Sequence, residues 1–435
     1  MRILRNLRLA TGQQIYTFIL NIVIGVLIAR ELGPTLLGVF VAIQIISANA
    51  EIFGRPKVDI GAMPYYGIHS LENKNILQNV NLIGLLASLI PVIVIFILQN
   101  IFIGTVINEK LLLPYHLIFT LIVLQIPLQG LYLNYVYYLN SWNEINYYIR
   151  VTNIREISYI VMVIILTITS NIKIEFLLSC IVLSLIFSLS YAIYITKIFP
   201  LVGFKYDRNF CKELLSKSFM LYLNGLIYHA QEYSQKILFT IFLSFKEIAF
   251  VNQGSNLAKL LYKFPDTASI ALYPEFIREG KDKYEIVLKA FRQILIIGFF
   301  VVVLLELFGH ILIGFLYGDV YIQSADLLMI FLPGAYMYSL ASLLISFINA
   351  NSPSLRVVKI QSIFFLSTTP IIAYCVIYFG MFGGVISASI SQSIFAIFMI
   401  KVFLETYGIG WNRLVPKRND IIQFLDALNY RLRQK

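Results

Sequence analysis

Charged side chains are scarce in this chain of 435 residues: only 13% are Asp, Glu, Lys or Arg, whereas 59% are hydrophobic. Soluble domains carry about 25% charged residues, so this composition excludes a soluble fold. Apolar runs near 20 residues recur from end to end, and each can cross a hydrocarbon core of about 30 Å. The pattern predicts an all-α polytopic membrane protein, because a β-barrel would show short alternating strands instead.

Metal-ligating and nucleophilic residues are also few. The three cysteines, Cys180, Cys211 and Cys375, are widely scattered, which indicates neither a disulfide framework nor a metal site. The four histidines lack metal-ligand spacing, and there is no GxxxxGK(S/T) phosphate loop, no HExxH and no CxxC. We therefore expect no cofactor, no metal and no enzyme activity, and the sequence does not favour a nucleotide-driven pump.

Apolar periodicity and length predict about twelve transmembrane spans. They lie at roughly 10–29, 36–54, 79–98, 114–138, 153–170, 174–196, 218–243, 248–271, 292–313, 325–348, 357–379 and 383–403.

Basic residues are distributed unevenly between the two sides of these spans. With the N-terminus in the cytoplasm, the outer connections hold only four: Arg30, Lys110, Lys173 and Lys246. Three more lie inside spans well away from their ends. The other 27 of the 34 belong to the N-terminus, to the inner connections with the span ends that adjoin them, and to the tail. The positive-inside rule then places both termini in the cytoplasm. This topology accounts for the net charge of +11 without a nucleic-acid partner.

The second half of the chain weakly repeats the first at a shift of 211 residues, which aligns Gly33 with Ser244. Transporters are often built from two such halves. We expect an N-terminal lobe of six spans at 1–200 and a C-terminal lobe of six spans at 201–404. The remaining 405–435 reads either as a basic amphipathic helix on the cytoplasmic membrane surface or as a solvated basic tail.

Charged side chains inside the spans are the candidate functional residues, because burying a charge in the bilayer costs about 2.5–3.5 kcal/mol. The eighth predicted span carries Lys259, Lys263 and Asp266 on one polar helical face. Lys259 lies about 16 Å of helix rise from either interface, which is too far for its side chain to snorkel. This face either lines a hydrated, anion-holding cavity or is neutralised internally by Asp266.

Three further pairs of ionisable side chains share helical faces: Glu51 with Arg55, Glu232 with Lys236, and Glu306 with His310. The first two pairs are either substrate or ion sites, or i,i+4 pairs that neutralise each other. Glu306 and His310 either carry a coupling proton or form a local hydrogen bond.

The segment 28–40, IARELGPTLLGVF, turns on Gly33-Pro34 and cannot continue as a helix, so it predicts a tight connection. It resembles the start of Wzx-type polysaccharide flippases, which belong to the multidrug/oligosaccharidyl-lipid/polysaccharide exporter superfamily. The matching positions are Ala29, Arg30, Gly33, Pro34 and Gly38. Looser matches follow at Leu272-Tyr273-Pro274, at Leu316-Tyr317-Gly318 with Tyr321, Ala325 and Leu327-Leu328, and at Gly380, Gly383, Gly384 and Ala388.

The resemblance implies two six-helix lobes that rock around a central, cationic cavity. The residues at matching places that would bind substrate are Lys259, Lys263, Arg55, Lys236 and Arg30, although Arg30 belongs to the signature and a structural role is its alternative. Possible ion-coupling residues are the acidic Glu51, Asp266, Glu232 and Glu306, and three of these accompany the cavity cations.

The resulting functional expectation is a flippase in the bacterial inner membrane. It would translocate an undecaprenyl-pyrophosphate-linked oligosaccharide, an O-antigen or capsule repeat unit, beside a glycan polymerase and other assembly proteins. The first alternative is a multidrug/cation antiporter with Glu51 as the acidic residue. A membrane glycan polymerase or acyltransferase is the second, but no large outer loop exists and nothing around His229 supports acyl transfer.

Overall fold

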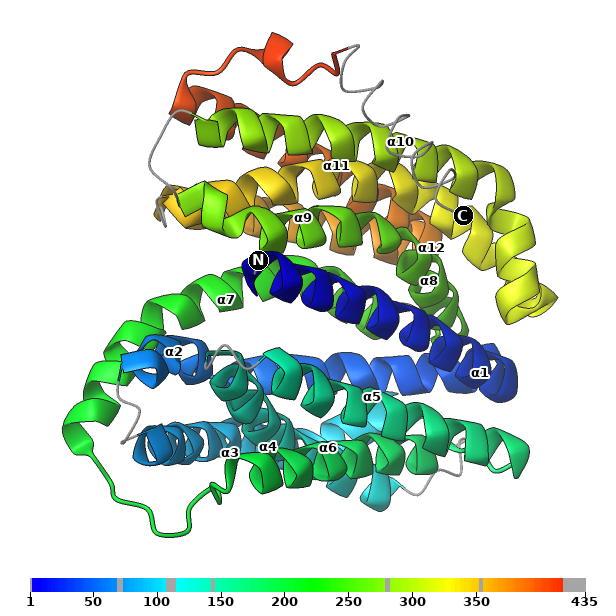
Figure 1. Cartoon of the computed structure of the whole chain (residues 1–435). Coiled ribbons are helices and arrows are strands. Elements are labelled where there is room, and N and C mark those ends of the chain that lie inside the picture. Colours follow the sequence, from blue (N-terminus) through cyan, green and yellow to red (C-terminus); the bar gives the residue numbers. More distant parts are fainter. Residues whose placement is uncertain are drawn as a thin grey trace, which may run out of the picture. The chain divides into compact units, whose positions relative to one another are not determined.

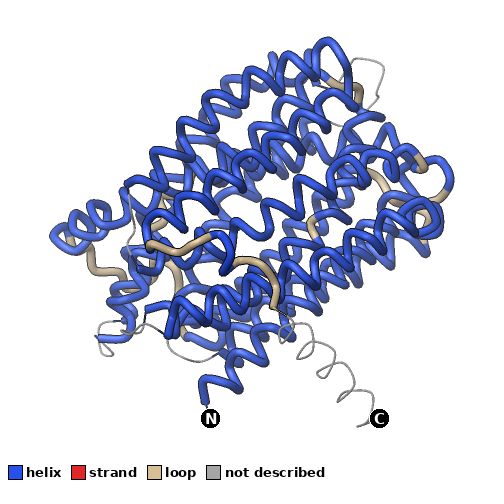
Figure 2. The backbone as a smooth tube through the Cα atoms, turned by 90° about the horizontal axis from the view of Figure 1, so that it is seen from above, coloured by secondary structure: helices blue, strands red, loops and turns tan. Residues whose placement is uncertain are grey.

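The computed structural model of the chain describes residues 2–68, 73–106, 115–141, 145–277, 282–351 and 355–417, and these ranges contain helices and loops but no strand (Figure 1, Figure 2). The predicted all-α polytopic fold is confirmed. The helices are α1 (Arg2–Phe53), α2 (Val58–Ile68), α3 (Asn73–Val106), α4 (Tyr115–Ser141), α5 (Ile145–Ile168), α6 (Ile174–Thr196), α7 (Arg208–Phe242), α8 (Phe245–Ala258), α9 (Leu260–Ile277), α10 (Asp282–Tyr317), α11 (Gln323–Asn351) and α12 (Leu355–Tyr407).

Two compact units make up the chain, Met1–Ile237 and Leu238–Lys435. The N-terminal unit contains α1 to α6 and most of α7, and the C-terminal unit contains α8 to α12. The lobe boundary at residue 200 stays a prediction. The amphipathic helix expected in the tail lies, beyond residue 417, outside the described residues.

Eight helices in the described ranges are long and apolar enough to cross a membrane. Two of them are longer than one crossing, because α1 and α12 each contain a kink that separates two predicted spans. The span on α7 and the span on α8 with α9 are more polar or are broken, which is why hydropathy and length alone do not select them.

Glycines with left-handed backbone angles make both kinks. Gly33 has φ 68° and ψ 171° and is followed by Pro34, which confirms the predicted tight connection after the first span. Gly380 has φ 62° and ψ −151° and separates the spans predicted at 357–379 and 383–403. The turn aligned with Gly33 by the repeat is built differently, since Ser244 caps α8 in a capping box with Glu247.

The segments around the second span of each unit contain more helix boundaries than the sequence predicted, although α1 ends at Phe53, close to the predicted end at residue 54. After Phe53 the chain bends and continues as α2, within what the sequence predicted as a loop. In the other unit the helix breaks at Lys259, between α8 and α9. Hydropathy does not locate these boundaries, because one lies in a polar connection with a positive φ at Lys57 and the other is a single residue with helical backbone angles at Lys259.

The core of the N-terminal unit is rich in tyrosine. Helix α4 packs against α2, α3 and α6, and α1 packs against α3, α4 and α5. Tyr66, Tyr135 and Tyr138 are almost fully buried, and the rings of Tyr66 and Tyr138 meet edge to face at 4.8 Å. The Tyr135 hydroxyl donates to the Ile198 carbonyl at 2.5 Å, which ties α4 to the chain after α6.

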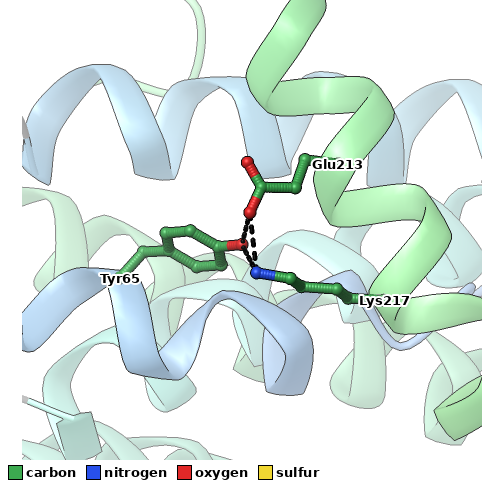
Figure 3. Close-up of polar contacts among 3 residues, drawn as sticks. All are labelled: Tyr65, Glu213 and Lys217. Carbon is green, nitrogen blue, oxygen red and sulfur yellow. Dashed lines mark hydrogen bonds and ion pairs between the residues drawn. The ribbon is translucent and has the colours of Figure 1, made fainter.

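A polar clasp joins α2 to the start of α7 within the same unit (Figure 3). Lys217 Nζ donates to the Tyr65 hydroxyl and to Glu213 Oε1, both at 2.6 Å, and the Tyr65 hydroxyl donates to Glu213 Oε1 at 2.7 Å. These hydrogen bonds lower the pKa of Glu213 and raise that of Lys217. These three side chains thus hold the last turn of α2 against the beginning of α7.

The C-terminal unit is organised around α11, which packs against α8, α9, α10 and α12. Phe347, near the end of α11, is fully buried in the core of this unit. Its ring centroid lies 5.1 Å from that of Phe276 and 5.8 Å from that of Phe403. Helices α11 and α12 approach closely at Gly334, whose N–H donates to Ser389 Oγ at 3.1 Å. A methyl group added there would meet the Ser389 Cα at 2.6 Å.

Candidate functional site

A cavity of about 180 Å³ lies in the N-terminal unit where α1 ends and the chain bends into α2. Glu51, Arg55 and Lys57 line it from this bend. Facing them are Ser88 from α3, Gln129 and Gly130 from α4, and His229 from α7. The cavity therefore collects charged and polar side chains from four helices of one unit.

Arg55 is held by partners that the sequence did not indicate. Its guanidinium forms an ion pair with Asp59, which is fully buried one turn further on in α2. It also lies over the Tyr137 ring, 5.5 Å from the ring centroid. The sequence left open whether Arg55 pairs with Glu51. In the structure Arg55 forms its ion pair with Asp59.

Glu51 accepts a hydrogen bond from Gln125 Nε2 at 2.9 Å. The charge of Arg155 on α5 also acts on the Glu51 carboxylate. Gln125 Oε1 and Gln129 Oε1 are buried and have no hydrogen-bond partner in the described part of the chain. Buried polar atoms without partners are costly, so a water molecule or a polar ligand beside these oxygens would stabilise the region.

Lys57 is a charged residue of this cavity that sequence analysis missed. It has a left-handed backbone with φ 55° at the bend between α1 and α2, and it lies outside the apolar spans. Burial lowers the pKa of its ammonium group to about 8, and the nearby charge of Arg55 adds to this effect. Because Lys57 lies between two predicted spans, the sequence predicts an ordinary loop lysine there.

In the C-terminal unit the polar face of α8 and α9 turns away from its own core. Lys259 stands at the helix break, where its Nζ donates to Asn256 Oδ1 at 2.7 Å. Lys263 and Asp266 are exposed, whereas Leu257 and Leu261 on the other side are buried. These polar side chains therefore form a partly exposed face that continues across the interruption between α8 and α9.

The remaining predicted residues are spread over both units. Arg30 is exposed beside the Gly33 kink, Lys236 is half-buried on α7, and the side chain of Glu232 lies outside those described. Glu306 is half-buried on α10. His310 Nε2 lies 3.0 Å from Asp326 Oδ1 on α11, so the histidine has a partner other than Glu306.

Two of the missed residues were hidden by their positions in the sequence. Arg155 lies at the inner end of the predicted fifth span, a common place for a basic residue, but α5 begins at Ile145 and places Arg155 further inside the helix. Its guanidinium is 5.1 Å from the Tyr132 ring centroid. Asp59 follows the predicted second span and appeared to be a loop residue. The i,i+4 spacing of Arg55 and Asp59 was the available signal.

Solved structures that resemble this chain include a lipid flippase and multidrug transporters. The chain superposes on the lipid II flippase MurJ in an inward closed conformation with a TM-score of 0.72 at 17% identity, covering 92% of this chain and 88% of that one. An inward-facing multidrug resistance MATE family transporter of the MOP superfamily gives 0.68 at 14% identity, covering 90% and 94%. The Vibrio cholerae MATE transporter VcmN in its bent form gives 0.60 at 12% identity, covering 93% and 96%.

These likenesses establish a fold shared with MurJ and the MATE transporters. No family model matches the chain, and no curated protein matches it by sequence.

Proposed function

We propose that this chain is a flippase that moves an undecaprenyl-pyrophosphate-linked oligosaccharide, an O-antigen or capsule repeat unit, across the bacterial inner membrane by alternating access. The observation that carries the proposal is the polar face of α8 and α9, on which Lys259 is half-buried and Lys263 is exposed. A polar face that carries two cations within a predicted crossing favours a hydrated surrounding or an anionic guest, because charge in hydrocarbon is costly.

A pyrophosphate headgroup fits this requirement. Ammonium groups form short, charge-assisted hydrogen bonds with phosphate oxygens, which offset the cost of removing the headgroup from water. Lys259 stands at the interruption between α8 and α9, and interrupted helices form the substrate sites of many transporters. The polyprenyl chain would remain in lipid throughout.

The cavity of the N-terminal unit supplies a second group of cations. Arg55 and Lys57 line it, and in our proposal they bind the anionic headgroup in one of the two conformations. Arg30 and Lys236 are further substrate-binding candidates. We propose Glu51, Asp266, Glu232 and Glu306 as candidates for ion coupling.

Orientation and partners complete the proposal. Both termini would lie in the cytoplasm, as the distribution of Lys and Arg predicts. The chain would act next to a glycan polymerase and other polysaccharide assembly proteins. A flippase of this kind needs two conformations and a site open to each side in turn, but no catalytic residue.

A multidrug/cation antiporter is the second candidate, and one observation favours it. Glu51 is a carboxylate within a membrane crossing, it lines the cavity, and a neutral amide from Gln125 holds it. Such a carboxylate can bind a cation or a proton. The neighbouring Arg55 and Lys57 weaken that role, because they oppose a second positive charge in the same cavity.

Replacing Lys259 and Lys263 by Ala, singly and together, tests the flippase. Each variant should reduce export of surface polysaccharide about tenfold, and the pair about a hundredfold, since a charge-assisted contact contributes about 1.5–3 kcal/mol. Export is measured as surface polysaccharide in cells that carry the biosynthetic genes, with membrane insertion checked by the amount of protein in the membrane fraction.

Lys212→Ala is the matched control. Lys212 is exposed at the start of α7, and its replacement removes the same charge outside the proposed site. Normal export by the double variant, at parental membrane levels, would overturn the proposed anion site. Unchanged polysaccharide together with a loss of drug resistance in Glu51→Gln cells would favour the antiporter instead.

A further inference from the structure

A surface groove of about 440 Å³ lies in the C-terminal unit, between the first and the last turns of the α12 hairpin. Its lining combines charged and apolar side chains: Lys359, Ile360, Phe398, Lys401, Val402 and Glu405. None of these residues belongs to the polar face of α8 and α9 or to the cavity of the N-terminal unit.

The Gly380 kink explains why the two lysines meet at one level. Lys359 lies 21 residues before Gly380, and Lys401 lies 21 residues after it. The two arms of α12 run back along each other from the kink, so both lysines are about 30 Å of helix rise away from it. That distance is the thickness of the hydrocarbon core, which places the groove at a membrane boundary.

The charge of the groove is incompletely neutralised. Lys401 Nζ is 3.9 Å from Glu405 Oε1, at the outer limit of an ion pair between exposed groups. In the described residues no carboxylate pairs with Lys359, which is exposed. Two cations and one carboxylate leave a net positive charge in the groove. An anion at a membrane boundary is therefore complementary to it.

The surface just beyond the groove is apolar on both arms. Ile363 follows Lys359 by one turn, Ile397 precedes Lys401 by one turn, and 67% and 51% of these two side chains are exposed. Residues four apart on a helix are neighbours, so each lysine adjoins an exposed isoleucine on the side toward the kink. A bound anion with apolar chains would match both parts of this surface.

We propose that this groove is a binding site for an anionic phospholipid. Lys359 and Lys401 hold its phosphate, Phe398 and Val402 contact its glycerol backbone, and its acyl chains lie along Ile363 and Ile397. Basic pockets between transmembrane helices at a membrane boundary bind anionic headgroups by the same physics. Glu405 repels the phosphate and limits its affinity.

Lipid binding by the purified full chain tests the proposal, with phosphatidylglycerol and phosphatidylcholine as the two probes in native mass spectrometry. Each basic residue near an anionic lipid surface contributes about 1 kcal/mol, or about a fivefold change in affinity. We expect Lys359→Gln and Lys401→Gln each to weaken phosphatidylglycerol binding about fivefold, and the pair about thirtyfold. Glu405→Gln should strengthen it.

The control variant Lys212→Gln/Lys289→Gln removes two exposed lysines from outside the groove and should bind phosphatidylglycerol as the parent does. Equal binding by the parent and the Lys359→Gln/Lys401→Gln variant, or equal binding of both lipids by the parent, would overturn the proposal. Displacement of phosphatidylglycerol by millimolar inorganic phosphate would assign the groove to free phosphate. Displacement by low concentrations of a polyprenyl phosphate would assign it to the transported lipid.

Discussion

The surroundings of Lys57 change both its backbone conformation and the pKa of its ammonium group. Its left-handed backbone is uncommon for a residue with a side chain, and it occurs where α1 bends into α2. The same bend buries the ammonium group beside Arg55, which lowers its pKa to about 8. A lysine with such a pKa changes its charge close to physiological pH.

A titration of the lysines, labelled with ¹³C-methyl groups and observed by NMR, checks this behaviour. We expect one lysine resonance with a midpoint near pH 8 that is absent from Lys57→Gln. Arg55→Gln should move the midpoint upward, because it removes a neighbouring positive charge. A parent protein in which no lysine titrates below pH 9 would contradict the assignment.

The sign of the linked stability follows from the same pKa. Lys57 in the folded chain releases its proton near pH 8, whereas the unfolded lysine keeps it up to its ordinary value of 10.5. Between these values the unfolded chain binds more protons, so the contribution of Lys57 to the free energy of unfolding rises with pH. Loss of transport above pH 8 would therefore reflect the lost charge and not unfolding through this group.

Residue by residue, the sequence identified several charged groups but not their partners. Glu51 and Arg55 were predicted as site residues, and both line the cavity in the N-terminal unit. Their partners Gln125 and Asp59 were not predicted. Gln125 lies 74 residues from Glu51, on another helix, and no local pattern connects positions so far apart.

At the level of helices, α11 and α12 of the C-terminal unit are in close backbone contact. Gly334 on α11 lies against Ser389 on α12, at a separation that leaves no room for a methyl group. Close approach of this kind is typical of small residues at helix interfaces in membranes, where van der Waals contact and hydrogen bonds drive association. Nothing in the apolar periodicity distinguishes Gly334 from the other glycines.

Gly334→Ala should lower the free energy of unfolding by about 1–3 kcal/mol, because an added methyl group overpacks the α11–α12 contact. The measurement is the midpoint of thermal unfolding of the purified protein in detergent. Gly309→Ala is the matched control: its new methyl group would meet Leu328 at an ordinary 3.4 Å, so its midpoint should stay at or above the parental one. An unchanged midpoint for Gly334→Ala would refute the close contact.

On the scale of the whole molecule, the alternation of basic charge predicts how the chain is oriented. The Gly33 kink should lie on the outer side and the connection between α6 and α7 on the cytoplasmic side. Glu31 and Val202 are exposed residues in these two places and are suitable reporter positions.

Cysteine accessibility in intact cells checks this orientation. In a background without Cys180, Cys211 and Cys375, a membrane-impermeant thiol reagent should label Glu31→Cys, whereas Val202→Cys should react only after the cells are opened. The two variants serve as controls for each other. The reverse labelling pattern would mean that the chain is inserted in the opposite orientation.

The fold class, the approximate spans and the tight connection at Gly33 follow from the amino-acid sequence alone, because hydropathy, length and the backbone demands of Gly-Pro are local properties. The sequence also located charges within the crossings, where their cost makes them conspicuous. The partners of these charges depend on the folded chain, which brings Arg55 to Asp59, Glu51 to Gln125, and Lys359 and Lys401 to one groove. The positions of the helix breaks at Lys57 and Lys259 also came from it, since partners and bends depend on how distant helices pack.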